Sequence, residues 1–284
     1  MNNKTLYRNF LVELQKIYDL SEATFITDWV FEKLGSLKKT DIIKNPKKEV
    51  LASIEKLIKD SLLELMQHKP VQYVLGEAWF YSAKFKVNEH VLIPRPETEE
   101  LVEQLINDRK SKITDPVILD IGTGSGCIPI IIKKKLPAAV VNSIDISEEA
   151  LLLAKENATF HHTDIKFSQL DFLDEKNWHL LPVCNIIISN PPYIPLSQKD
   201  KVDKNVKDYE PHVALFVPDD SPLIFYHKIA AFGKDKMQHD GKIYLETHEN
   251  LANEVADIFR RANYHSVMVK KDMYGKERMV IATA

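Results

Sequence analysis

Cysteine, long apolar runs and excess positive charge are all missing or scarce in this chain. Only 2 of the 284 residues are cysteine, and Cys127 and Cys184 both fall in segments predicted to be buried. We therefore expect inert core thiols in a reducing cytoplasm, and neither a disulfide nor a metal ligand. No apolar run has the length of a membrane helix, and residues 1–4 lead into an amphipathic pattern without a signal-peptide core. A net charge of −3 and a pI near 6.4 argue against a surface that neutralises phosphates, so we expect no membrane and no direct nucleic-acid partner.

Glycine is scarce too, yet three of the 8 glycines lie within residues 122–126. They belong to the segment Asp120-Ile121-Gly122-Thr123-Gly124-Ser125-Gly126, which follows a short apolar strand at 116–119 and precedes a predicted helix at 128–136. Such glycines indicate a backbone that turns tightly and lets a ligand approach its amides. Cys127 stands where a dinucleotide fingerprint has its third glycine, so nicotinamide binding fits poorly. The next predicted strand ends in Asp145, about twenty residues past the glycines, where an acid typically binds the hydroxyls of a ribose. These features predict a nucleoside site.

A second polar motif, Ser189-Asn190-Pro191-Pro192-Tyr193, follows the apolar run at 183–188. That run predicts a buried strand, so the motif should lie at its carboxyl end, where open α/β sheets build their sites. Two prolines remove two backbone donors and leave carbonyls free to accept hydrogen bonds. The side-chain oxygen of Asn190 and the carbonyl of Pro191 can together accept both protons of an –NH2 group, while Tyr193 offers a flat face. A strand-ending turn is the alternative, because Asn-Pro commonly starts turns.

Together these motifs resemble those of S-adenosylmethionine-dependent N-methyltransferases. The narrower resemblance is to the HemK/PrmC-type enzymes that methylate a glutamine of peptide-chain release factors. It is carried by Leu-Ile-Pro-Arg-Pro-Glu-Thr-Glu at 92–99, with Pro-Val-Gln-Tyr-Val-Leu-Gly-Glu at 70–77 just before it. Asn-Pro-Pro-Tyr alone also occurs in enzymes that act on adenine in DNA. The resemblance runs from about Pro70 to the end of the chain and extends loosely into the helical start.

The resemblance implies a fold, an activity and a set of site residues. The fold is α/β, a Rossmann-like class I methyltransferase sheet that is mostly parallel with an antiparallel last strand, beside a small N-terminal all-helical domain. The activity is methyl transfer to the N5 of the glutamine in a GGQ motif, with S-adenosyl-L-homocysteine as the product. The residues implied for the cofactor are Asp120, Gly122, Thr123, Gly124, Ser125, Gly126, Asp145, Asp171, Phe172 and Asn190. Those implied for the substrate are Asn190, Pro191, Pro192, Tyr193, Arg95 and Glu97, of which Asn190, Pro191 and Tyr193 are catalytic. A core position is the alternative for Phe172.

The chain divides into three predicted regions. Residues 1–73 carry helical periodicity, with Ser21 as a candidate cap for a second helix and Asn45-Pro46 as a candidate start for a third. The resemblance implies that this domain docks the protein substrate. Residues 74–98 have a period of two from Trp79 to Ile93, which predicts a hairpin linker, and Thr98 is a candidate cap for a following helix. Residues 99–284 should form the methyltransferase domain. Its last two strands, 264–269 and 278–282, should pair antiparallel. The polar stretch 199–211 resembles the family's loop after the active motif, which implies that it covers bound substrate.

The expected mechanism follows from the weak nucleophilicity of an amide nitrogen. With no strong base near Asn190 in the sequence, two acceptors are expected to orient the –NH2 toward the sulfonium methyl, with the proton lost to water afterwards. Many relatives carry a glycine soon after the glutamate at 246, where this chain reads Thr247-His248-Glu249-Asn250. We expect His248 to be a loop or helix-start residue and not a base. No cluster has metal-ligand spacing, so no metal is expected.

Two rival functions differ in class. An adenine-N6 methyltransferase acting on DNA or RNA can use the same Asn190 loop on a flipped base. The net charge, the lack of an added basic domain and the 94–99 segment disfavour it. The second rival is a cofactor-binding module without catalysis, which would require that the intact Asn190 loop has no function.

Overall fold

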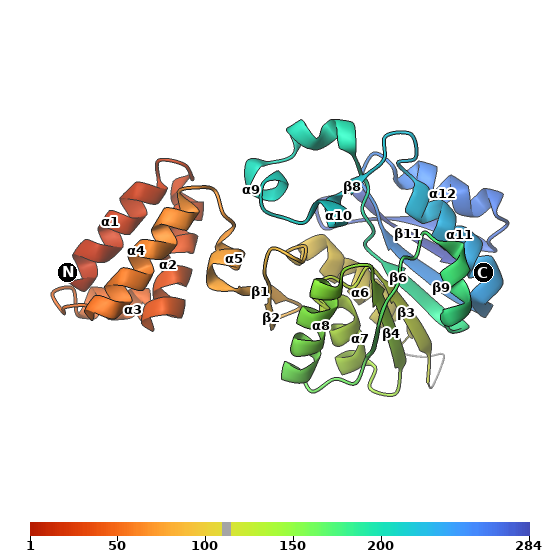
Figure 1. The fold of residues 1–284 in the computed structure, drawn as a ribbon, viewed down its shortest axis with the longest axis horizontal. Coiled ribbons are helices and arrows are strands. Elements are labelled where there is room, and N and C mark those ends of the chain that lie inside the picture. The colour runs from red at the N-terminus through yellow and green to blue at the C-terminus, as the bar shows by residue number, and fades with distance from the viewer. Residues whose placement is uncertain (110–114) are drawn as a thin grey trace. The chain divides into compact units, whose positions relative to one another are not determined.

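The structure is a computed structural model that describes residues 1–109 and 115–284, and these residues form two compact units (Figure 1). The helical unit comprises Met1–Glu77 together with Asp203–Tyr209. The sheet unit comprises Ala78–Val202 and Glu210–Ala284. The linker predicted at 74–98 is divided at Glu77: residues 74–77 belong to the helical unit, and residues 78–98, with the proline-rich segment, belong to the sheet unit. Among the described residues, no helix has the length and apolarity to span a membrane.

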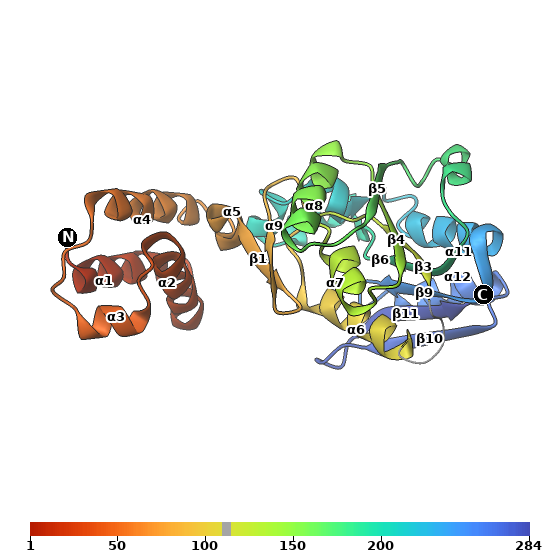
Figure 2. The same cartoon turned by 90° about the horizontal axis from the view of Figure 1, so that it is seen from below.

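The helical unit packs its helices around an apolar core (Figure 2). Its helices are α1 (Asn3–Leu14), α2 (Leu20–Gly35), α3 (Lys39–Lys44), α4 (Ala52–Leu65) and α5 (Val71–Leu75), with the short α9 (Lys204–Lys207) in the later segment. Each long helix buries one stripe of residues, for example Leu6, Phe10 and Leu14 of α1, as helical periodicity predicts. Tyr209 donates its hydroxyl hydrogen to the Gln67 carbonyl at 2.7 Å, which ties the later segment to this unit.

Two predicted helix starts in this unit are wrong. The cap of α2 is Asp19 and not Ser21, because the Asp19 carboxylate accepts from the Glu22 amide at 2.9 Å. Asn45-Pro46 follows α3 and does not begin α4. The reason is tertiary: amides in the first turn of α1, which have no partner within their own helix, donate to the carbonyls at positions 46 and 48. These bonds hold residues 46–50 out of a helix.

The hairpin is shorter than its sequence pattern suggests. It consists of β1 (Glu77–Phe80) and β2 (Ala83–Lys86), joined by Tyr81 and Ser82, which both have positive φ as a tight hairpin turn requires. Beyond Lys86 buried and exposed residues still alternate, but the chain no longer forms a strand. There the Asn157 side chain accepts from the Lys86 amide and donates to the Lys86 carbonyl, which occupies the backbone groups that a longer strand would use.

The described part of the sheet unit contains one large sheet of seven strands, in the order β10-β11-β9-β6-β3-β4-β5 (Figure 1). The strands are β3 (Val117–Ile121), β4 (Val140–Asp145), β5 (Lys166–Gln169), β6 (Cys184–Ser189), β9 (Met237–Glu246), β10 (Ser266–Lys271) and β11 (Glu277–Thr283). The five strands from β9 to β5 run parallel, whereas β11 is antiparallel to both β9 and β10. The predicted mostly parallel sheet with an antiparallel last strand is confirmed.

Helices cover both faces of this sheet. The main ones are α6 (Pro96–Arg109), α7 (Cys127–Lys135), α8 (Glu148–Phe160), α11 (Ile224–Lys236) and α12 (Ala252–Arg261). Smaller elements are β7 (Ile194–Pro195), β8 (Phe216–Val217), α10 (His212–Leu215) and the 3₁₀ helices at Glu175–Leu180 and Leu196–Lys201. Successive strand residues serve opposite faces: Ile186 and Ile188 pack with α6 and α7, while Ile187 packs with α11 and α12. Both cysteines are buried free thiols.

The chain order of the strands reverses between β3 and β6. From β3 the chain moves through β4 to β5, and it then returns to β6 and β9 on the other side. At such a switch point the loops after the two central strands diverge and leave a crevice at the carboxyl edge. The glycine-rich segment follows β3 and the Asn190 motif follows β6, so the fold brings both predicted motifs to this edge.

Candidate active site

A cavity of about 300 Å³ lies at this carboxyl edge, entirely within the sheet unit. Of the residues predicted for the cofactor, the cavity wall includes Gly122, Thr123, Gly124, Ser125, Asp145, Asp171, Phe172 and Asn190. Of those predicted for the substrate, Arg95 and Pro192 also line it. Asp120 and Gly126 support the loop from behind, and Pro191, Tyr193 and Glu97 lie outside the lining. The structure therefore brings most of the predicted residues to one cavity.

The glycine loop is shaped to receive a ligand on its backbone. Gly122, Gly124 and Gly126 have φ values of 81°, 52° and 80°, a region that side chains disfavour. A Cβ atom built at Gly122 or Gly124 would meet nothing within 4 Å, so these two positions present bare backbone to open space. At Gly126 the same atom would approach the Ala154 Cβ to 3.1 Å, so that glycine allows the loop to pack against α8. A nucleoside cofactor fits such a cradle.

Asp145 ends β4 and is held by the glycine loop itself. Its Oδ2 accepts from the Gly124 amide at 2.9 Å, and its Oδ1 accepts from the Ser147 amide at 3.0 Å. Burial raises the pKa of Asp145, and the backbone donors oppose that rise. The carboxylate thus fixes the loop and at the same time lines the cavity, as a residue that binds ribose hydroxyls must.

Asp120 is fully buried at the end of β3, one residue before the loop. Its Oδ2 accepts from the Ser143 hydroxyl at 2.6 Å, and burial raises its pKa to about 7. Since Asp120 does not line the cavity, its position suits support of the loop more than direct contact with a ligand.

Phe172 and Asp171 follow β5 at the next position along the edge. Phe172 is buried, and its ring stacks on Trp178 with centroids 5.7 Å apart; the residue also lines the cavity. Asp171 is exposed, and its Oδ1 accepts from the Leu173 amide at 2.9 Å. Phe172 therefore combines a core position with a place on the cavity wall, so the two readings of this residue are compatible.

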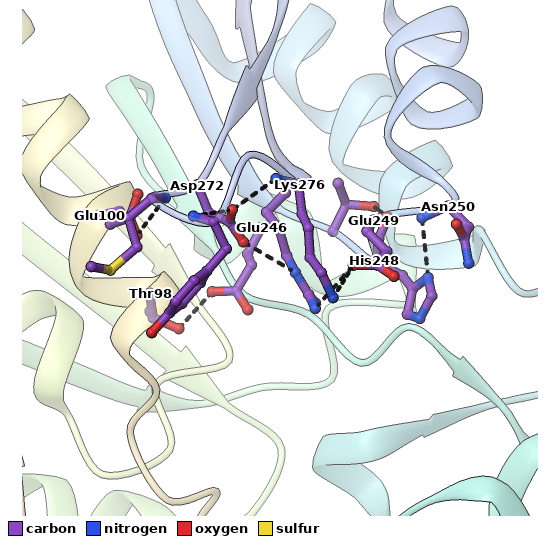
Figure 3. Close-up of polar contacts among 12 residues, drawn as sticks. Thr98, Glu100, Glu246, His248, Glu249, Asn250, Asp272 and Lys276 are labelled. Carbon is purple, nitrogen blue, oxygen red and sulfur yellow. Dashed lines mark hydrogen bonds and ion pairs between the residues drawn. The ribbon is translucent and has the colours of Figure 1, made fainter.

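The Asn190 motif is anchored to the neighbouring strand and to α6. Ser189 donates its hydroxyl hydrogen to the Ile121 carbonyl at 2.7 Å, which joins the ends of β6 and β3. Asn190 donates from Nδ2 to the Thr98 hydroxyl at 3.1 Å. Thr98 in turn donates to Oε2 of Glu246 at 2.5 Å (Figure 3). With its nitrogen turned to Thr98, Asn190 has its Oδ1 directed away from Thr98.

The predicted capping role of Thr98 is wrong. Helix α6 begins at Pro96, so Thr98 lies inside its first turn, and its hydroxyl is committed to Glu246. Sequence reasoning also assigned no role to Glu246. A usable signal was present, because Glu246 ends β9, which pairs in parallel with β6 and so ends at the same edge of the sheet.

Tyr193 is half-buried, and its ring makes an edge contact with His248 at a centroid distance of 6.0 Å. Burial raises the pKa of the Tyr193 hydroxyl, so this group is neutral at physiological pH. His248 accepts at Nδ1 from the Asn250 amide at 3.2 Å, and burial lowers its pKa (Figure 3). A neutral imidazole that packs on Tyr193 suits the predicted loop role.

Arg95 and the chain after the Asn190 motif are joined by a buried carboxylate. Arg95 donates from Nη2 to Oε1 of Glu210 at 2.5 Å, and the Ile93 amide donates to Oε2 at 3.1 Å. Glu210 is buried, so removal of Arg95 would leave a buried charge without this partner. The pair holds the proline-rich segment at the cavity. Among the described residues, no group of three or more His, Cys, Asp or Glu side chains could hold a metal ion.

Comparison with known proteins identifies a clear set of relatives. Residues 97–207 match the methyltransferase small domain family. A release factor glutamine methyltransferase of Flavobacterium psychrophilum is 40% identical over 280 residues, which make up 98% of this chain and 97% of that protein. The enzyme of the same name from Streptococcus pneumoniae is 39% identical over 97% of this chain and 96% of its own length. Among solved structures, a methyltransferase from Pyrococcus furiosus covers 79% of this chain and 98% of its own with a TM-score of 0.52 at 17% identity, which supports the fold alone.

Proposed function

The chain belongs to the release factor glutamine methyltransferases, and from this premise we propose that it transfers the methyl group of S-adenosylmethionine to the N5 of the GGQ glutamine in peptide-chain release factors. The observation that carries the proposal is the position of Asn190. This residue directly follows β6 and lines the same cavity as the glycine loop after β3. A nucleoside bound on the loop and an amide bound by Asn190 would therefore share one cavity.

The residues present fit S-adenosylmethionine, which supplies an electrophilic methyl group on a positively charged sulfur. Gly122 and Gly124 leave backbone open to the ligand, and Asp145 offers its carboxylate to the ribose hydroxyls. Phe172 provides an apolar wall for the adenine, with Asp171 beside it as an acceptor for the adenine amino group. These assignments place the predicted cofactor residues around one nucleoside.

Orientation is the chief contribution that the chain makes to the reaction. The lone pair of an amide nitrogen is delocalised into its carbonyl, so the nitrogen is a poor nucleophile. Asn190 Oδ1 and the Pro191 carbonyl would accept the two amide protons and hold the –NH2 group toward the methyl donor. The same two acceptors would stabilise positive charge as it develops on the nitrogen. Tyr193, neutral and held by His248, would limit the movement of the planar amide.

The proton on the substrate nitrogen is released after methyl transfer, when the nitrogen is positively charged and strongly acidic. Asp145 already accepts from the amides of Gly124 and Ser147, and we assign its remaining acceptor capacity to the ribose hydroxyls. His248 packs on Tyr193 and is held through Nδ1. We therefore assign the proton to water.

Methylation of adenine in DNA or RNA is the weaker alternative. The same Asn190 loop can accept from an exocyclic amine, but the net charge of −3 offers little attraction for a phosphate backbone. The full-length relatives also carry the name of the protein substrate class.

The experiment is a methyl-transfer assay with labelled S-adenosylmethionine and three acceptors: a bacterial release factor, a DNA duplex and ribosomal RNA. The matched control is the same release factor with its GGQ glutamine replaced by alanine. Label is expected only on the unmodified release factor, and mass analysis should place it on that glutamine. Label on either nucleic acid with none on the protein would reject the proposal.

A further inference from the structure

Thr98 links two polar side chains that come from distant parts of the chain. Asn190 lies 92 residues away and Glu246 lies 148 residues away, yet both contact the same Thr98 hydroxyl. We propose, on the basis of the function above, that Thr98 and Glu246 are positioning residues that determine which end of the Asn190 amide faces the substrate.

The direction of the hydrogen bonds carries this inference. A threonine hydroxyl has one hydrogen to donate, and an ionised carboxylate can only accept. The Thr98 hydrogen therefore goes to Glu246, at 2.5 Å, and Thr98 can only accept from Asn190, at 3.1 Å. Asn190 must then turn its nitrogen toward Thr98 and keep its oxygen for another donor. An oxygen is what a substrate –NH2 group requires.

Burial makes this chain of hydrogen bonds favour one orientation of the Asn190 amide. Thr98 is 3% exposed and Glu246 is 2% exposed, so water has little access to replace either partner. A buried polar group that loses its partner bears the full cost of desolvation. The orientation of Asn190 is thus set by groups that have few alternatives.

Protonation of Glu246 would reverse the chain of bonds. A protonated carboxyl group can donate to Thr98, which frees the Thr98 hydrogen to be donated to Asn190 Oδ1. The Asn190 amide would then turn over and present its –NH2 to the substrate –NH2, two donors with no acceptor between them. Burial raises the pKa of Glu246 to about 7, which brings both states within reach near neutral pH.

Charged groups from several elements face Glu246. Arg278 of β11 and Arg95 favour its ionised form, and Glu97 of α6 opposes it. Arg278 is itself shared with Glu249 at 3.6 Å and with Asp272 at 3.7 Å, so its charge is partly compensated. Lys276 pairs with Glu249 at 2.7 Å.

Uncharged groups complete these surroundings. Tyr226 of α11 donates to the main-chain carbonyl of Glu246 at 3.0 Å and does not touch the carboxylate through that bond. Tyr193 lies close enough to Glu246 for the two to influence each other, and His248 follows two residues after Glu246. Burial keeps both rings uncharged at neutral pH, since it raises the pKa of Tyr193 and lowers that of His248.

The test is single-turnover methyl transfer to a release factor at saturating cofactor, measured as a function of pH. Thr98→Val should lower the rate about 10- to 100-fold, the usual cost of removing a partner that orients a site residue. Thr98→Ser, which restores the hydroxyl, should recover most of that loss. Titrations of S-adenosylmethionine should show little change in Kd for either variant. Thr27→Val is the matched control, because Thr27 is equally buried and its hydroxyl donates to the Ala23 carbonyl in the helical unit.

Glu246→Gln provides a second, independent measurement. Because burial raises the pKa of Glu246 to about 7, the parent rate should fall through a single ionisation as the pH drops below that value. Glutamine at 246 cannot ionise, and its amide can either accept from Thr98 or donate to it, so the rate of this variant should be free of that ionisation. A Glu246→Gln profile that keeps the acid limb, or a folded Thr98→Val with the parent's rate, would overturn the inference. If Thr98→Val fails to fold, the Glu246→Gln profile decides. A parent enzyme that binds cofactor but never methylates the release factor would instead refute the proposed function.

Discussion

Asp145→Ala is expected to weaken cofactor binding and to loosen the glycine loop at the same time. The carboxylate accepts from the amides of Gly124 and Ser147, at 2.9 and 3.0 Å, and it lines the cavity. Loss of a charged acceptor for the ribose should cost roughly 1.5–3 kcal/mol, which is about a 10- to 140-fold rise in Kd. The two loop amides also lose their acceptor, so the free energy of unfolding should fall by about 1–3 kcal/mol.

Calorimetric titration of S-adenosylmethionine and a thermal melt on the same preparation separate these two effects. Asp174→Ala is the matched control, because the Asp174 carboxylate also accepts from a backbone amide, that of Lys176 at 3.1 Å, but lies outside the cavity lining. The control should lose a little stability and keep its Kd. An Asp145→Ala protein that is less stable but binds the cofactor with the parent's affinity would refute the ribose assignment and leave Asp145 as a loop support only.

Three further results are expected. Asn190→Ala should lower kcat by about 10²–10³, the usual loss for one preorganised hydrogen-bonding group, with a much smaller change in cofactor Kd; turnover within tenfold of the parent would contradict the mechanism. A chain that begins at Pro70 should still bind cofactor, but its KM for the release factor should rise. The reason is that Tyr209 loses its Gln67 partner and the segment 203–209 loses the helices it packs with. An unchanged KM would exclude a docking role for the helical unit. Burial raises the pKa of Asp120 from 3.8 to about 7, so the stability it confers is fully present below pH 3.8 and is lost progressively as the pH rises from there to about 7. Asp120→Asn should therefore raise Tm relative to the parent, and this rise should be larger at pH 8 than at pH 5. An equal difference in Tm at both pH values would show that Asp120 does not change its protonation state between them.

The sequence by itself determined the architecture of the sheet and the location of both motifs. Apolar runs at 116–119, 139–144 and 183–188 became β3, β4 and β6, because a parallel strand buried on both faces must be apolar at successive positions. The clustered glycines and the two prolines constrain their own backbone, so their loops follow from local chemistry. The parallel order of the strands then placed both loops at one edge.

Only the tertiary structure decided how these loops are held. The partners of Thr98, Arg95 and Tyr209 lie 92 to 148 residues away, and no local pattern records such contacts. The same is true of the helix starts in the first unit, where bonds to α1 keep residues 46–50 from continuing as helix. Backbone propensity is a property of a few neighbouring residues, whereas the partner of a buried hydroxyl or carboxylate depends on which strands the fold sets side by side. For Asn190, the sequence shows that an acceptor is present. The direction in which that acceptor points depends on Thr98 and Glu246, which only the fold brings to it.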